Sequence, residues 1–337
     1  MVTYPKVSIC VPIYGVEKYI EQCAESLFGQ TYENLEFIFI NDHTQDLSML
    51  ILENVIKKYP QRQKQIKIIN HETNQGLAVA RNTAIKHVSG QFVLWVDSDD
   101  FVDINLVTYL VEEQMKSDAD IVLSDVYKFD GKKNVLVCQK SNFSPKEYLH
   151  AVLREEVEHW IWGKLIKIDL YLKNNISVKP GANMGEDFQV LPQLIYHANR
   201  IAYVNKPLYY YNVSNLKSYG HLVREDVQMQ RWATYEVIVN NIITDEYGSD
   251  LVYLKLQMCY FQIKTYLLAN NLSKEYLSYL CDRLNEIPFE VYRQYPLFKR
   301  CLLAFFYRKN GVPSFGKLTS VLLVLYVHLI DFVKSIR

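Results

Sequence analysis

The chain has 337 residues, of which 49% are hydrophobic and 22% are charged, so it can bury a large core and is not disordered. Its 37 basic and 37 acidic side chains give a formal net charge of zero at pH 7, which argues against nucleic acid as a partner. The six cysteines share no close spacing, which argues against a zinc site, and no signal-peptide pattern opens the chain. We therefore expect reduced thiols and a cytoplasmic location.

Apolar strands and amphipathic helices alternate along the first hundred residues. The pattern predicts strands at Val7–Ile13, Glu36–Ile40, Ile66–Ile69 and Phe92–Val96, separated by helices at Glu17–Phe28, Asp46–Tyr59 and Leu77–Val88. Strands this apolar are typical of a parallel sheet that helices cover on both faces. The fold class is therefore α/β, and ligands of such sheets bind beyond the carboxyl ends of the strands.

The pattern becomes mixed after residue 103. It predicts a helix at Ile104–Lys116, a strand at Ile121–Phe129, a short acidic helix at Glu186–His197, and strands at Ile201–Val204 and Leu208–Tyr211. Beyond Leu222 the chain is helical almost throughout, with breaks at proline.

Polar residues follow each of the first four strands, and the acidic turn Asp97-Ser98-Asp99-Asp100 is the most specific of them. Carboxylates clustered at the end of a buried strand cost free energy unless a partner compensates their charge. A divalent cation bound to a diphosphate would be such a partner, because Mg²⁺ and Mn²⁺ prefer hard oxygen ligands. A solvated surface turn is the alternative interpretation.

Four motifs follow one another along the first hundred residues: Pro12-x-Tyr14 at the end of the first strand, the Asn41-Asp42 turn that ends in Asp46, Asn74-x-Gly76 with Ala80-Arg81-Asn82, and the acidic turn. Together these motifs resemble those of the family-2 inverting glycosyltransferases of bacterial cell-surface polysaccharide synthesis. The resemblance is strong over residues 5–103 and weaker to about residue 215. It implies the glycosyltransferase-A fold, a Rossmann-like, mixed but mainly parallel sheet flanked by helices, with a C-terminal helical extension here. It also implies a nucleotide-sugar-binding half at 1–103, an acceptor-binding half of the same catalytic domain at 104–217, and a helical region at 218–337.

The resemblance further implies a nucleotide-diphospho-sugar donor, with UDP expected, and Mn²⁺ or Mg²⁺ as cofactor. The matching positions suggest a role for each donor-side residue. Pro12 and Tyr14 would flank the nucleotide base, Asp42 would accept the hydrogen bond of the base imide, and Asn74 and Arg81 would hold the nucleotide or the loop beneath it. Asp97 with Ser98 would approach the ribose or the metal, and Asp99 would bind the metal. Turn capping by Asn74 and a structural ion pair for Arg81 remain open alternatives.

An inverting transfer also needs a base that takes the proton from the acceptor hydroxyl. By the same resemblance Asp187 is the base, and Glu186 contacts the acceptor or orients the site. The alternative is that both acids only complement the macrodipole of the helix that begins there. Trp162 and Lys164 resemble the acceptor-side segment of the family, although core packing explains either residue equally well.

The chain departs from the family pattern in its second loop and after its tyrosines. Asn41 replaces a frequent Asp, and Asp42-His43-Thr44 stands where an Asp-Gly-Ser turn is common, which leaves base and donor specificity open. The Arg expected after Tyr211 is absent, because Asn212 follows it.

The C-terminal end is basic and apolar. Seven Lys and Arg residues lie between Lys299 and the end of the chain, against the single acid Asp331. The run Leu318–Ile330 is shorter than a bilayer span, so its basic flanks favour a membrane-surface helix within 314–337. A buried helix or a dimer interface is the alternative, and homo-oligomerisation remains open.

These observations predict a hexosyl- or N-acetylhexosaminyl-transferase that extends a capsule, O-antigen or exopolysaccharide glycan. Its acceptor would be lipid-linked, at the inner face of the cell membrane. One alternative is a nucleotide-sugar-binding assembly partner without activity. The other is a sugar nucleotidyltransferase, which usually has a glycine-rich basic loop that Pro12–Gly15 does not provide.

Overall fold

The computed structural model describes residues 4–139, 143–215, 223–242, 244–269, 272–288, 291 and 303. The chain forms two compact units, one of Met1–Val152 with Glu156–Tyr219 and one of Leu153–Glu155 with Gly220–Arg337. The first unit holds the sheet and every residue for which the sequence predicts a role in the site.

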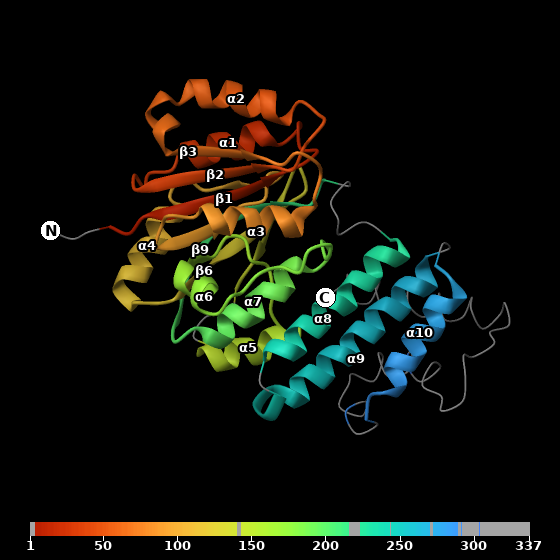
Figure 1. Cartoon of the computed structure of the whole chain (residues 1–337). Coiled ribbons are helices and arrows are strands. Elements are labelled where there is room, and N and C mark those ends of the chain that lie inside the picture. The colour runs from red at the N-terminus through yellow and green to blue at the C-terminus, as the bar shows by residue number, and fades with distance from the viewer. Residues whose placement is uncertain are drawn as a thin grey trace. The chain divides into compact units, whose positions relative to one another are not determined.

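Nine strands of the described residues form a single sheet (Figure 1). They are β1 Val7–Ile13, β2 Leu35–Asn41, β3 Ile66–Asn70, β4 Phe92–Trp95, β5 Phe101–Val102, β6 Ile121–Phe129, β7 Asn134–Val137, β8 Leu165–Lys167 and β9 Ile201–Asn212. Their order is β3-β2-β1-β4-β8-β6-β9-β5, and β7 pairs with β6. β1 to β4 are parallel, whereas β8 is antiparallel to both β4 and β6. The expected mixed, mainly parallel sheet is confirmed.

Helices cover this sheet on both sides. In the first unit they are α1 Ile20–Phe28, α2 Ser48–Lys58, the 3₁₀-helix η1 Pro60–Gln65, α3 Leu77–His87, α4 Leu106–Ser117, α5 Pro145–Leu153, α6 Ile168–Lys173 and α7 Glu186–His197. In Figure 1, α1 and α2 lie on the opposite side of β1 to β3 from α3. α3 packs on β1 and β2, and its buried Ala78, Ala80 and Ala84 let its backbone come close to these strands.

The second unit contains three described helices, α8 Glu225–Asn241, α9 Thr244–Leu268 and α10 Lys274–Asn285. Hydrogen bonds join these three helices to one another. The Oε1 atom of Gln262, for example, accepts hydrogen bonds from Nε1 of Trp232 and from the hydroxyl of Tyr276. None of the described helices is both long and apolar enough to cross a lipid bilayer. The segment 314–337, for which we expect membrane-surface binding, lies outside the described residues.

The elements of the first hundred residues occur within a few residues of their predicted bounds, because each strand carries its own apolar run. The prediction of two strands near residues 201–211 is wrong, because β9 is continuous from Ile201 to Asn212. Its register on β6 shifts between Ser124 and Asp125, and this shift accommodates the polar Asn205-Lys206 pair without ending the strand.

The strand order places a topological switch point between β1 and β4. The chain proceeds outward from β1 through β2 to β3, and then returns to pair β4 on the other side of β1. Crevices for ligands form at such points, beyond the carboxyl ends of the two strands. Tyr14 follows β1 and the acidic turn follows β4, so both lie at the edge where a ligand would bind.

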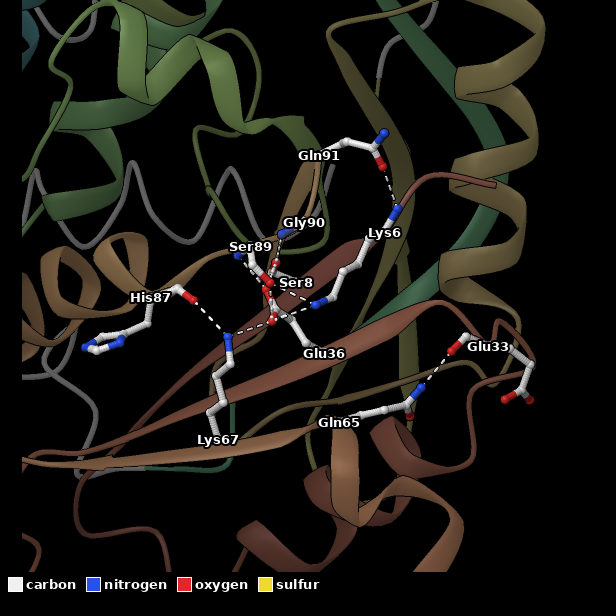
Figure 2. A network of polar contacts seen from close by, with 10 residues as sticks. All are labelled: Lys6, Ser8, Glu33, Glu36, Gln65, Lys67, His87, Ser89, Gly90 and Gln91. Atoms are coloured by element: carbon white, nitrogen blue, oxygen red, sulfur yellow. Dashed lines mark hydrogen bonds and ion pairs between the residues drawn. The ribbon is translucent and has the colours of Figure 1, made fainter. Parts of the chain in front are cut away.

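The opposite, amino end of the strands is held by the buried carboxylate of Glu36 on β2 (Figure 2). Its Oε1 accepts hydrogen bonds from Ser8 Oγ (2.5 Å) and Ser89 N (2.6 Å), and its Oε2 accepts one from Lys67 Nζ (2.9 Å) and one from Lys6 Nζ (3.1 Å). Burial alone would raise the pKa of Glu36, but these hydrogen bonds outweigh it and hold the pKa well below its usual range. Glu36 therefore joins β1, β2, β3 and the loop before β4.

Replacing Glu36 by Gln should lower the free energy of unfolding by about 3 kcal/mol at neutral pH, because two lysines and two serines lose an ionised acceptor. A depressed folded-state pKa stabilises the protein above the unfolded pKa of about 4.3, and this stabilisation is lost as pH falls toward the folded value. The difference in the free energy of unfolding between Glu36→Gln and the parent, measured with urea, should therefore narrow below about pH 4. Glu53→Gln, at an exposed position of α2, is the matched control and should change the free energy of unfolding little. Equal losses in the two variants would contradict a structural role for Glu36.

Candidate active site

The acidic turn after β4 is anchored by its last carboxylate. The amide of Asp100 donates to the Asp97 carbonyl oxygen (3.0 Å), which closes the turn. The Asp100 side chain is only 1% exposed, and it accepts hydrogen bonds from the Tyr209 hydroxyl and from the Asn212 amide, each at 2.7 Å. Burial, together with the charges of Asp99 and Asp97, raises the pKa of Asp100 well above its usual range. Asp100 therefore fixes the turn onto β9, and Asp97 and Asp99 remain as ligand candidates.

Asp97 and Asp99 together carry an excess of negative charge. Oδ2 of Asp99 accepts a hydrogen bond from Nδ2 of Asn215 (2.7 Å), but no Lys or Arg among the described residues forms an ion pair with Asp99. Burial and the neighbouring charge of Asp97 raise the pKa of Asp99 to about 6. A bound cation would relieve this repulsion, so the two carboxylates fit Mg²⁺ or Mn²⁺. Ser98 between them is buried.

Arg81 of α3 connects this turn to the predicted base. Its Nη2 lies 3.2 Å from Oδ1 of Asp97, 3.2 Å from Oε1 of Glu186 and 3.0 Å from Oδ1 of Asp187. The guanidinium is buried and lies 5.1 Å from the centre of the Trp95 ring. The structure therefore brings together acids that lie about ninety positions apart in the sequence, around one cation. Arg81 therefore forms ion pairs within the protein, which is the alternative to contact with the nucleotide that the sequence left open.

Glu186 and Asp187 titrate as a pair, because both carboxyls are buried beside Arg81. Burial raises the pKa of both carboxyls, and the charge of Asp187 raises that of Glu186 further, while Arg81 lowers both. A carboxyl whose pKa is raised is a better proton acceptor near neutral pH, so the pair is a candidate general base.

Asp42, at the loop after β2, holds the loop that leads into α3. Its Oδ1 accepts a hydrogen bond from the Gln75 amide (2.8 Å) and lies 2.7 Å from Nδ1 of His71, and its Oδ2 accepts one from the Gly76 amide (2.8 Å). The residue is buried, so the predicted contact with a base imide would use a carboxylate that already has three partners. That contact stays a prediction. Asn74 is exposed on the same loop.

The loop after β1 presents one accessible aromatic side chain. Tyr14 is 55% exposed, whereas Pro12 is buried within β1. The next residue, Gly15, donates its amide hydrogen to Thr44 Oγ1 (2.9 Å), which ties this loop to the loop after β2. His43 adopts a left-handed φ of 58°, and this conformation explains why the related turn commonly has glycine there.

Both acceptor-side candidates lie in the interior. Trp162 is 3% exposed and stacks between Trp160 and Tyr209, with ring centres 4.4 and 4.3 Å away. Lys164 is equally buried, and burial lowers its pKa to about 8 against the opposing charge of Asp187. Direct contact of either side chain with an acceptor stays a prediction, and the structure gives both a packing role.

Several residues that contact the site carry no sequence signal that we could interpret. Asn212 occupies the position where the family pattern has Arg, and its Nδ2 donates to the Asp99 carbonyl oxygen (3.1 Å). A single amide or imidazole side chain in a helix, strand or loop carries no pattern that separates a site contact from an ordinary structural residue. The sequence reasoning missed the following site contacts: His71, Asn82, Asn183, Asn212 and Asn215.

The fold is that of solved glycosyltransferase-A structures. The structure of S. aureus TarS residues 1–349 in complex with UDP-GlcNAc superposes with a TM-score of 0.72 and 22% sequence identity, covering 89% of this chain and 87% of that one. The glycosyltransferase-A fold implied by the motifs is therefore confirmed.

Sequence relatives carry glycosyltransferase names. The uncharacterized glycosyltransferase EpsJ of Bacillus subtilis is 30% identical over 237 residues, which are 67% of each chain. Glycosyltransferase GlyA of Streptococcus pneumoniae is 28% identical over 225 residues, or 63% of this chain, but the match spans only about a third of the length of GlyA (31%).

The model of the family described as Glycosyl transferase family 2 matches residues 8–194, more than half of the chain. This range begins in β1 and ends within α7, so it includes the acidic turn, Arg81 and the Glu186-Asp187 pair. With the fold and the arrangement of these acids, the match shows that the chain belongs to family 2 of the glycosyltransferases.

Proposed function

We propose that this protein is a metal-dependent inverting glycosyltransferase that moves a hexosyl or N-acetylhexosaminyl group from a UDP-sugar to a glycan hydroxyl. The observation that carries the proposal is the grouping of Asp97, Glu186 and Asp187 around Arg81 at the switch point of the sheet. This grouping supports a mechanism in which a cation-binding turn lies beside a carboxylate that accepts a proton. The UDP-GlcNAc complex of TarS, which has the same fold, supports the class of donor.

In this proposal the nucleotide binds along the loops after β1, β2 and β3. The exposed ring of Tyr14 packs on the base, and Asn74 and the Asp42-held loop contact the nucleoside. Asp99 and Asp97 hold Mn²⁺ or Mg²⁺ by carboxylate oxygens. The metal, when bound, supplies positive charge that stabilises the departing diphosphate.

Asp187 is the base of the proposed reaction. Its carboxylate takes the proton of the acceptor hydroxyl as that oxygen attacks the anomeric carbon from the face opposite the diphosphate. The bond from the anomeric carbon to the acceptor oxygen forms while the bond to the diphosphate oxygen breaks, and the configuration inverts. Arg81, which also contacts Glu186, holds Asp187 in place.

The acceptor in this proposal is a growing surface glycan on a polyprenyl-diphosphate carrier, at the cytoplasmic face of the membrane. The basic and apolar composition of 314–337 supports a membrane-surface location. The hydroxyl acceptor and the linkage depend on groups around Asp187 that a donor screen does not test.

A panel of UDP-, GDP- and dTDP-sugars, each with Mn²⁺, tests the proposed reaction. We expect release of UDP from a UDP-sugar, slowly to water and faster with glycan acceptors. Binding of the donor without any turnover would instead indicate an assembly partner without activity. Release of pyrophosphate from a nucleoside triphosphate and a sugar phosphate would indicate a nucleotidyltransferase.

The rate should rise with pH across the acid range, because Asp187 must lose its proton to act as base. Burial raises the pKa of Asp187 to about 6, so the rate should fall progressively as pH drops below that value. We would measure UDP release at saturating donor from about pH 5 to about pH 8, with the melting temperature recorded at each pH to exclude unfolding. A rate independent of pH over this range would contradict a carboxylate base with a raised pKa.

A further inference from the structure

The backbone between α6 and α7 has no regular structure, yet it carries the acid pair at its end. Residues 176–185 belong to no helix or strand, and α7 begins at Glu186. A base on such a segment needs support, because irregular backbone lacks the hydrogen bonds that fix a strand or a helix. Helix α3 provides that support through three separate contacts.

The first contact joins Asn82 to both backbone polar groups of one residue, Val178. Its Nδ2 donates to the Val178 carbonyl oxygen (2.7 Å), and its Oδ1 accepts a hydrogen bond from the Val178 amide (2.9 Å). A neighbouring strand would satisfy the backbone of Val178 in the same way. Only a primary amide combines a donor and an acceptor in this geometry, so neither Asp nor Leu, although of similar size, can replace Asn82.

The second contact joins Asn183 to the start of α3. Oδ1 of Asn183 accepts a hydrogen bond from the Ala78 amide (2.9 Å), which satisfies one of the donors that a helix leaves unpaired in its first turn. Gly76 makes room for it, because a Cβ atom there would lie 2.5 Å from Nδ2 of Asn183, and its φ of +86° also favours glycine.

The third contact is the ion-pair group of Arg81 with Glu186 and Asp187. Ala78, Arg81 and Asn82 are spaced i, i+3 and i+4, so they share one face of α3. Together they hold the segment near its beginning, near its middle and at the acid pair. The same helix contacts Asp97 through Arg81, so it sets the distance between the base and the metal-binding turn.

We propose that Asn82 is a positioning residue for the base Asp187, although it touches neither acid directly. This inference rests on the proposed transferase activity. Releasing Val178 would let the segment shift, and a displacement of about 1 Å in a catalytic group can reduce the rate about 10²-fold. The donor site would be preserved, because the loops after β1, β2 and β4 have their own anchors in Thr44, Asp42 and Asp100.

The test compares the same Asn→Asp change at two positions. In Asn82→Asp the donor to the Val178 carbonyl is lost and two acceptors face each other, so kcat should fall about 10- to 100-fold. In Asn54→Asp, at an exposed position of α2, the same charge is added outside the segment, so kcat should stay within about 3-fold of the parent. Donor affinity, measured by titrating UDP-sugar, should change less than about 3-fold in both variants.

Amide hydrogen exchange supplies a readout that does not need turnover. The Val178 amide should exchange about 10-fold faster in Asn82→Asp than in the parent, while β1 keeps its protection. Should Asn82→Asp not fold, Asn183→Leu loosens the same segment and should likewise lower kcat at constant donor affinity. Unchanged kcat and unchanged exchange at Val178 in Asn82→Asp would overturn the inference, as would parallel losses of kcat and donor affinity. A parent protein that binds donor but never turns it over would overturn the proposed function instead, and the exchange result would still decide whether Asn82 holds the segment.

Discussion

Replacement of Asp187 by Asn is expected to lower kcat by about 10²- to 10⁴-fold, because the variant has no group to take the acceptor proton. Asn is close to Asp in size, so the packing of α7 is retained, and Arg81 keeps Asp97 and Glu186 as partners. In the proposed function the donor binds at the other loops of the sheet edge. The loss should therefore appear in kcat, with the affinity for the UDP-sugar nearly unchanged.

We would measure the rate of UDP release at a saturating concentration of the UDP-sugar, and the affinity for the same donor by calorimetric titration. Asp169→Asn is a matched control, because Asp169 is about half exposed on α6 and pairs only with Lys173, one turn away. It should behave as the parent does. Transfer at the parent rate by Asp187→Asn would remove Asp187 from the base role, and Glu186 would then be the next residue to replace.

Replacement of Asp99 by Asn is expected to abolish the metal dependence of donor binding and to lower kcat/KM by about 10³-fold. A metal ion contributes several kcal/mol to stabilising the departing diphosphate, and each 1.4 kcal/mol corresponds to about a factor of ten. The parent protein in excess chelator should show a loss of similar size. The variant itself should be insensitive to chelator, and this insensitivity distinguishes a lost metal ligand from a general defect.

The same variant should be more stable than the parent. In the folded protein the pKa of Asp99 is raised to about 6, so at neutral pH its charge opposes folding. Removing that charge should raise the free energy of unfolding by about 1–2 kcal/mol, and Asn can still accept the hydrogen bond from Asn215. An inactive, stabilised variant would indicate that the acidic turn is kept for metal and donor at a cost in stability. Full activity in the presence of chelator would contradict the metal assignment.

Much of the first half of the fold can be derived from local sequence. β1, β2 and β4 are almost wholly buried, so each is a mainly apolar run between amphipathic helices. The short strands are different. β8 has three residues and β5 has two, and they exist because β4, β6 and β9 offer them partners. A pattern of two or three residues carries no period from which a strand could be predicted.

The sequence by itself identified the candidate acids, because Asp97-Ser98-Asp99-Asp100 follows a predicted strand, Glu186-Asp187 begins a predicted helix, and both match the family that the motifs resemble. Only the tertiary structure decided how these acids divide their roles. Asp100 became an anchor through Tyr209 and Asn212, and Arg81 became the link between the two motifs. The physical reason is that pairing, burial and charge depend on distances in space between residues that lie about a hundred positions apart. A local sequence pattern specifies helices and strands, but it carries no information about these distances.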